Sequence, residues 1–231
     1  MIVKNSQSIL FVFTFLLGGY ALKAQQVYIE TGVSSAFFKN YVNSSGENTL
    51  DLKYSKSYAT FLESGFQLDI FQGKLKIAIG LGYNNFEIKT GFYAGNISIP
   101  TTYNLSYFLL KTGAIFNVVN KPKFKIQVHS HVSYDWLTSG TNSYKDVVVD
   151  LYQDNTFDKG LLRFHRGLST EYIISDETAL YVSYNVADSF KDENSDSNVG
   201  EKYSLHTNTF SFGILFSLNA YRNQPWNRFK G

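Results

Sequence analysis

The stretch SYATFLESGFQLDI, residues 57–70, decides the fold class. Apolar side chains dominate every second position, and the positions between them, apart from Phe61, carry small or polar residues such as Glu63 and Asp69. A period of two held over this length is typical of a strand with one apolar face and does not fit a helix. The same alternation returns in residues 74–84 and 124–136, so the sequence predicts an all-β protein.

The links between the predicted strands indicate how the strands are arranged. Eight strands are predicted, near residues 26–38, 57–70, 74–88, 103–119, 124–137, 160–174, 178–188 and 203–218. Tight turns at 72–73, 120–123 and 175–177 alternate with long polar stretches at 39–56, 89–102, 138–159 and 189–202. Most of these strands exceed the roughly 9–11 residues that a tilted strand needs to cross a bilayer. Outer-membrane barrels have this alternation, with long loops outside and short turns in the periplasm. We therefore expect an eight-stranded antiparallel up-and-down transmembrane β-barrel.

The N-terminus has the features of an export signal. Lys4 provides a positive charge, the apolar run 9–17 follows, and Ala24 is the small residue expected before the cleavage site. We predict a cleaved signal peptide at 1–24, a barrel domain at 25–218 and a periplasmic tail at 219–231. Cleavage removes two lysines and no acidic residue, which brings the net charge of +2 to about zero and argues against nucleic-acid binding.

A soluble barrel would show the same alternation but would point its apolar face inward. Two features favour the membrane. Aromatic residues gather near the ends of the apolar faces, as interfacial girdles do: Tyr58, Phe124, Tyr134, Trp136, Tyr172 and Tyr184. The last strand also spaces Ser211, Gly213, Phe216 and Leu218 like the C-terminal signal read by the barrel-assembly machinery.

Two short stretches carry a family resemblance. The Ala24-Gln25 start and the segment Tyr107-Phe-Leu-Leu-Lys111 resemble those of small eight-stranded outer-membrane barrels, in particular the PorT-like "outer membrane protein beta-barrel domain" group. The resemblance covers nearly the whole mature chain. It implies a porin-like fold in the outer membrane of a Gram-negative cell envelope, and says little about activity.

If the apolar faces meet lipid, the lumen receives charges of both signs. An eight-stranded barrel is just wide enough for side chains to fill it, and buried charges must be paired. We therefore expect a lumen charge network without a continuous water channel, built from Glu30, Glu63, Lys76, Lys111, Arg163 and Glu171. Glycines at inward positions, among them Gly80 and Gly213, are expected to make room for long charged neighbours.

Three histidines, His129, His131 and His165, also fall on inward positions and could in principle bind zinc or copper. Packing within the polar lumen is the preferred explanation, and neither a metal nor a cofactor is predicted. The pair His131-Val-Ser133 resembles the His-x-Ser pair of outer-membrane lipid A deacylases, with Glu171 as the possible third member. That pair lies on the lipid-facing wall in those enzymes, whereas here both residues face inward, so no catalytic site is predicted.

The predicted function is a non-enzymatic integral outer-membrane anchor that presents its surface loops as an interaction scaffold above a plugged lumen. Val147–Val149 could extend a strand above the membrane and pair with another protein. The expected partners are outer-membrane lipid, the barrel-assembly machinery and an unidentified extracellular or periplasmic protein. The alternatives are a narrow pore, a subunit of an envelope or secretion assembly and, third, a lipid A-modifying enzyme.

Overall fold

The computed structural model describes residues 25–42, 57–71, 73–94, 97–153, 159–190 and 202–218. The predicted signal peptide, the predicted tail and most of the predicted loops 39–56 and 189–202 lie outside these residues. Within the described chain, no helix has the length and apolar character needed to cross a membrane.

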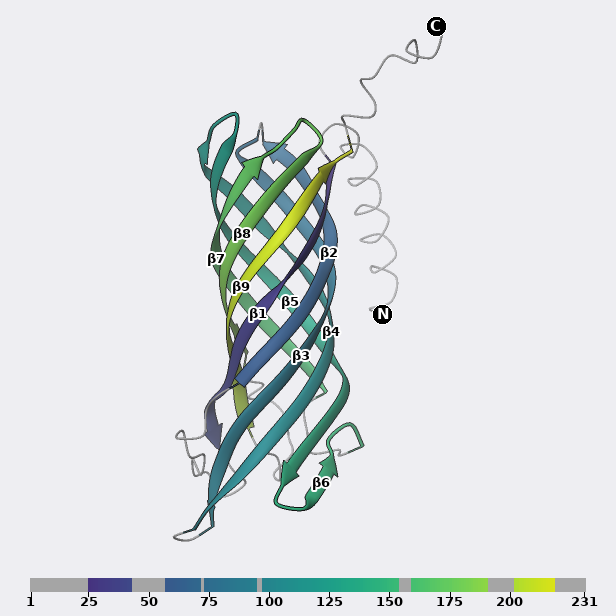
Figure 1. Ribbon diagram of the computed structural model, residues 1–231, viewed down its shortest axis with the longest axis vertical. Helices are drawn as coiled ribbons and strands as arrows, with labels where there is room; N and C mark the ends of the chain where they lie inside the picture. Colours follow the sequence, from purple (N-terminus) through teal and green to yellow (C-terminus); the bar gives the residue numbers. More distant parts are fainter. Residues whose placement is uncertain are drawn as a thin grey trace, which may run out of the picture.

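The described strands form one closed antiparallel wall (Figure 1). They are β1 (Gln25–Val42), β2 (Ser57–Phe71), β3 (Leu75–Ala94), β4 (Ile97–Asn120), β5 (Phe124–Tyr144), β6 (Val147–Asp150), β7 (Gly160–Ile173), β8 (Thr178–Ser189) and β9 (Lys202–Ser217). Each long strand pairs with the next long strand along the chain, and β9 pairs with β1 to close the ring. The short β6 pairs with the far end of β5. The wall therefore has eight strands, and the predicted up-and-down barrel is confirmed.

All three predicted tight turns are confirmed, at β2–β3, β4–β5 and β7–β8. They lie at one end of the barrel, called here the turn end, which is at the top of Figure 1. The opposite end, where β6 lies, is called the loop end. Gly73 has a φ of 72° in the β2–β3 turn, a left-handed conformation that glycine adopts without steric cost.

The prediction of a long polar loop at 89–102 is wrong. β3 and β4 continue as a paired hairpin as far as Ala94 and Ile97. Lys89 and Pro100 are exposed in this segment, as in a loop, but the register partners Thr90 and Thr101 point inward and are buried. Inward burial keeps the segment in the sheet. Similarly, β5 continues to Tyr144, and Val147–Val149 lies in β6.

The apolar face of the alternation points outward over the turn-end part of the barrel. On β5, alternate residues from Phe124 to Trp136, apart from Ser130, are apolar and 36–44% exposed, whereas the residues between Gln127 and Asp135 that alternate with them are polar and buried. An exposed apolar band around a polar interior is the reverse of a soluble barrel and is typical of a membrane-spanning one. The lipid-facing orientation predicted from the sequence is therefore confirmed.

Toward the loop end the interior changes character. A cluster of buried apolar side chains fills the barrel there, and we call it the outer core: Ala36, Phe38, Ala59, Phe86, Ile88, Tyr103, Leu105, Tyr107, Leu137, Leu151, Leu161 and Leu205. The outer wall around it carries polar residues such as Asn85, Glu87 and Lys89. This end of the barrel is thus built like a water-soluble protein, with an apolar inside and a polar outside.

Two inward glycines make room for tyrosines, and Gly80 also leaves space for the carboxylate of Glu63, a long charged neighbour of the kind that we expected. A Cβ on Gly80 would overlap the Tyr28 hydroxyl, and a Cβ on Gly213 would overlap the ring of Tyr181. Each tyrosine lies across the glycine of a neighbouring or nearby strand and reaches a lumen carboxylate. The glycines therefore position the two phenols.

Candidate functional site

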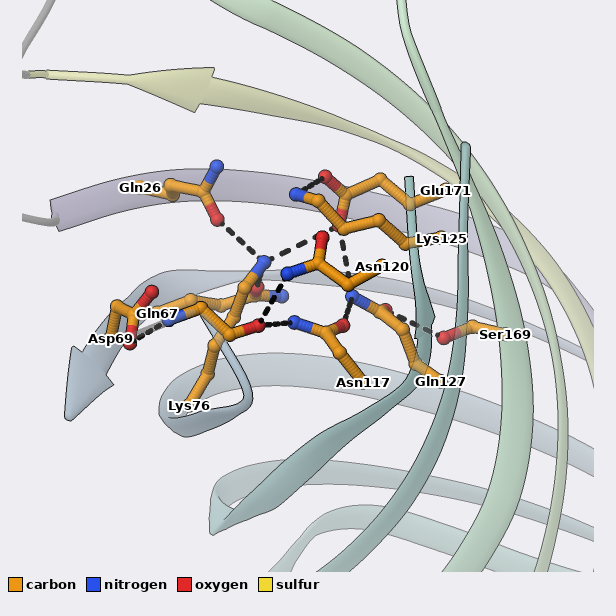
Figure 2. A network of polar contacts seen from close by, with 11 residues as sticks. Gln26, Gln67, Asp69, Lys76, Asn117, Asn120, Lys125, Gln127, Ser169 and Glu171 are labelled. Carbon is orange, nitrogen blue, oxygen red and sulfur yellow. Dashed lines mark hydrogen bonds and ion pairs between the residues drawn. The ribbon is translucent and has the colours of Figure 1, made fainter. Parts of the chain in front are cut away.

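The candidate site is the polar lumen, whose charged side chains form three groups between the turn end and the outer core. The first group centres on Glu171 of β7 (Figure 2). Its Oε1 accepts a hydrogen bond from Lys125 Nζ at 2.6 Å, and its Oε2 accepts from Lys76 Nζ at 3.3 Å and from Gln127 Nε2 at 2.9 Å. Lys76 Nζ also donates to Gln26 Oε1 at 2.8 Å. The carboxylate is 1% exposed, so its charge is balanced inside the protein.

The strand register explains one of the two ion pairs of Glu171, and the narrow width of the lumen explains the other. Lys125 and Glu171 lie directly opposite each other on β5 and β7. Lys76 comes from β3, which is not a neighbour of β7 in the sheet. The ion pair between Lys76 and Glu171 therefore crosses the lumen from one wall to another.

The second group lies farther from the turns and contains two carboxylates. Glu30 and Glu63 are register partners on β1 and β2. Glu63 pairs with Lys111 Nζ at 2.5 Å and accepts a hydrogen bond from the Tyr28 hydroxyl. Glu30 is held by hydroxyl groups, at 2.8 Å from Tyr181 and also from Ser183 and Ser211.

The third group adjoins the outer core. Arg163 Nη1 lies 3.0 Å from Asp135 Oδ2, and the two side chains are 2% and 0% exposed. Arg163 Nη2 donates to the Thr207 hydroxyl, and the guanidinium lies 5.7 Å from the centre of the Phe86 ring. Asp135 was not among the residues predicted for the charge network, although its position in the alternation places it on the inward face.

The histidines do not assemble a metal site. The rings of His129 and His131 lie 5.3 Å apart, and His165 is the register partner of His131. His165 Nε2 instead lies 2.8 Å from the Ser133 hydroxyl. Among the described residues, no group of three or more His, Cys, Asp or Glu side chains is placed to hold a metal ion.

The hydroxyl of Ser133 also donates to Asp135 Oδ1 at 2.5 Å, so it bridges an imidazole and a carboxylate. This is not the order of a catalytic triad, in which the imidazole lies between the hydroxyl and the carboxylate. Glu171, considered as the third member, is bound by two lysines in the group at the turn end. Ser133 is 1% exposed and faces the lumen, away from lipid.

Small spaces remain between the charged groups. One of about 30 Å³ adjoins Glu30, His129 and His131, and one of about 40 Å³ adjoins Arg163 and His165. A third, of about 160 Å³, lies at the turn end beside Lys76 and Lys125. The first two have room for about one water molecule each.

The residues of the predicted assembly signal lie on β9 and just beyond it. Ser211 and Gly213 face the lumen, where Ser211 binds Glu30. Phe216 and Leu218 are 40% and 41% exposed on the outside. Recognition of this strand by the assembly machinery stays a prediction.

No family model matches the chain, and no curated protein matches it, so the PorT-like resemblance stays a prediction. Several solved structures are similar in fold. Neisserial surface protein A aligns with a TM-score of 0.49 and 13% identity, over 84% of this chain and 97% of its own. A major outer membrane protein from Thermus thermophilus aligns with a TM-score of 0.48 and 11% identity, over 84% and 99%. The attachment invasion locus protein Ail of Yersinia pestis aligns with a TM-score of 0.42 and 10% identity, over 84% and 99%. Similarities this distant support no conclusion about activity. The identification of an outer-membrane-type β-barrel rests on the strand register and the exposed apolar band of this chain.

Proposed function

We propose that the protein is a closed outer-membrane barrel that acts as a non-enzymatic anchor and presents its loop end to other molecules. The observation that supports this proposal is that side chains fill the lumen in two successive segments along the barrel. Charged side chains pair across the membrane-spanning part, and the apolar outer core fills the loop end. A solute would have to displace both.

The buried ion pairs and the outer core resist opening for different reasons. Removing one partner from a buried ion pair leaves an unbalanced charge and costs about 3–5 kcal/mol. In the outer core, Leu105, Tyr107 and Leu205 have no exposed surface. Parting such side chains would expose apolar area to water at about 25 cal/mol per Å². Spontaneous opening wide enough for ions is therefore unfavourable.

The loop end offers surface for a protein partner. The β3–β4 hairpin and the β5–β6 hairpin both extend beyond the apolar band, and β6 lies at the bottom of Figure 1. Ile97 is 68% exposed, Val148 is 66% exposed and Tyr152 is 50% exposed. Exposed apolar residues outside the band have no lipid to cover them, which supports a role in binding another protein.

Planar bilayer recordings on the refolded protein test the closed lumen. Slower gel migration after boiling than before it would verify, in the same sample, that the barrel is folded. We expect no steady single-channel steps from folded protein. Reproducible steps from a sample that passes the gel test would contradict the proposal and favour a narrow pore.

A subunit of a larger envelope assembly is the second candidate, and the exposed Val148 and Tyr152 favour it. Purification in mild detergent from the native membrane would test it, with a Val148→Asp variant as the matched control. A protein that co-purifies with the wild type and is lost from the variant would support the assembly role.

A further inference from the structure

The outer wall at β7, β8, β9 and β1 carries a group of charged residues that the lumen does not explain. On the turn-end side of this group, the register joins Leu168, Tyr184, Phe210 and Val33 in one row across the four strands. All four are apolar and 50–58% exposed. This row therefore belongs to the band that contacts lipid.

Arg166 is the next outward residue on β7 after Leu168, and it is exposed on the same wall, with 57% of its side chain accessible. Apolar residues continue beyond it toward the loop end, since Leu162 on β7 is 45% exposed and Trp136 on β5 is 42% exposed. Arg166 thus lies within the apolar band, on the turn-end side of the edge that the band has toward the loop end. A charged side chain on the lipid face is destabilising, less so near the interface, unless it reaches polar partners.

The partner that Arg166 reaches is already shared. Arg166 Nη2 lies 3.2 Å from Asp188 Oδ2, on the side toward the loop end. Asp188 Oδ1 also lies 3.3 Å from Lys39 Nζ and 2.5 Å from His206 Nδ1. The Asp188 carboxylate thus contacts two permanent cations, Arg166 and Lys39, as well as the imidazole of His206. The group has an excess of positive charge on a surface that faces the edge of a membrane leaflet.

We propose that Arg166 and Lys39 bind the phosphate of a lipid headgroup in the leaflet at the loop end, which is the outer leaflet. Three observations support this assignment: the excess positive charge, the exposure of both side chains, and their position on the loop-end side of the exposed apolar row. A guanidinium presents five donors in a planar fork that suits phosphate, and its contact with Asp188 leaves donors for a second anion. The inference uses the orientation of the barrel and does not depend on the scaffold role.

The test is lipid binding by the refolded protein in neutral detergent micelles, measured by native mass spectrometry. The probes are lipid A with two phosphates, the same lipid after dephosphorylation, and inorganic phosphate as a competitor. The variants are Arg166→Gln with Lys39→Gln, and Asp188→Asn. Lys89→Gln is the matched control, because Lys89 also forms an exposed ion pair, 2.8 Å from Glu87, but on the polar wall near the loop end. Gel migration before and after boiling verifies that each variant is folded.

We expect the double variant to bind the phosphorylated lipid at least ten-fold more weakly and Lys89→Gln to bind it like the wild type. Asp188→Asn should bind it more tightly, because the competing carboxylate loses its charge while the shape of the side chain is kept. Equal binding of the dephosphorylated lipid, or equal binding by the double variant, would overturn the proposal. Displacement by inorganic phosphate at concentrations equal to that of the lipid would show a site for free phosphate and would also overturn it.

Discussion

Replacing Glu171 by glutamine tests whether the lumen charges hold the barrel together. The change keeps the shape of the side chain but leaves the ammonium groups of Lys76 and Lys125, at 3.3 and 2.6 Å from the former carboxylate, without a counter-charge. At an effective dielectric constant of 20, the two lost attractions are about 5 and 6 kcal/mol before desolvation is counted. Net losses for a broken buried pair are about 3–5 kcal/mol.

The lower end of that range applies here. Lys125 is 15% exposed beside the cavity at the turn end and can move toward water, whereas Lys76 is 5% exposed and cannot. We therefore expect Glu171→Gln to lower the free energy of unfolding by about 3 kcal/mol, the cost of one uncompensated buried charge. Adding Lys76→Gln should restore at least about 1 kcal/mol, because the double variant no longer buries that charge.

Reversible urea unfolding in detergent micelles, followed by tryptophan fluorescence, measures these differences. Glu87→Gln is the control, since it breaks an exposed pair with Lys89 and should cost less than about 1 kcal/mol. A cost for Glu171→Gln no greater than that of the control would refute the reasoning. So would a double variant whose loss equals the sum of the two single losses.

Three further changes probe the other layers of the barrel by the same unfolding measurement. Gly213→Ala should cost about 1–3 kcal/mol, because its Cβ would overlap the ring of Tyr181, and Tyr181→Ala in the same chain should remove most of that added cost. Leu105→Ala should cost about 2–5 kcal/mol, since Leu105 is completely buried in the outer core; a loss below about 1 kcal/mol would mean that this core is loosely packed. Phe212→Arg should cost about 2–4 kcal/mol because Phe212 is 60% exposed in the apolar band, and the same substitution at Asn104, on the polar wall, should be nearly neutral.

The fold was predictable because period-two alternation fixes which residues share a face, and tight turns fix which strands are neighbours. The hairpin at 89–102 was missed because the alternation of apolar and polar residues does not continue through it. Its inward residues Thr90 and Thr101 are buried but polar, so no apolar face marks the segment as a strand.

The members of the lumen groups were also predictable, but most of their partners were not. Alternation places Lys76 and Glu171 inside, yet their ion pair joins strands that are not neighbours, so it depends on the width of the closed barrel. The charged group around Asp188 was missed for a related reason. Its members come from four strands and meet only through the register.

The edge of the apolar band toward the loop end can nevertheless be recognised in the sequence, as a reversal in the phase of the alternation. On β3 the outward side changes from apolar at Tyr83 to polar at Asn85, while the inward side changes from polar at Asn84 to apolar at Phe86. A strand that passes from lipid into water must make this exchange, because its lipid-facing side has to become polar while a core has to form inside.

Where the phase reverses, two consecutive residues are both polar or both apolar, and we call such a pair a doublet. The register aligns the doublets of three neighbouring strands. Asn84-Asn85 of β3 adjoins Tyr107-Phe108 of β4, and that pair lies opposite Trp136-Leu137 of β5. The apolar segment Tyr107-Phe-Leu-Leu-Lys111, whose two faces look alike in the sequence, is therefore the place where β4 leaves the membrane. Because such doublets break strict alternation, the unbroken alternation that we recognised in residues 74–84 and 124–136 ends at the membrane surface, although β3 and β5 continue to Ala94 and Tyr144.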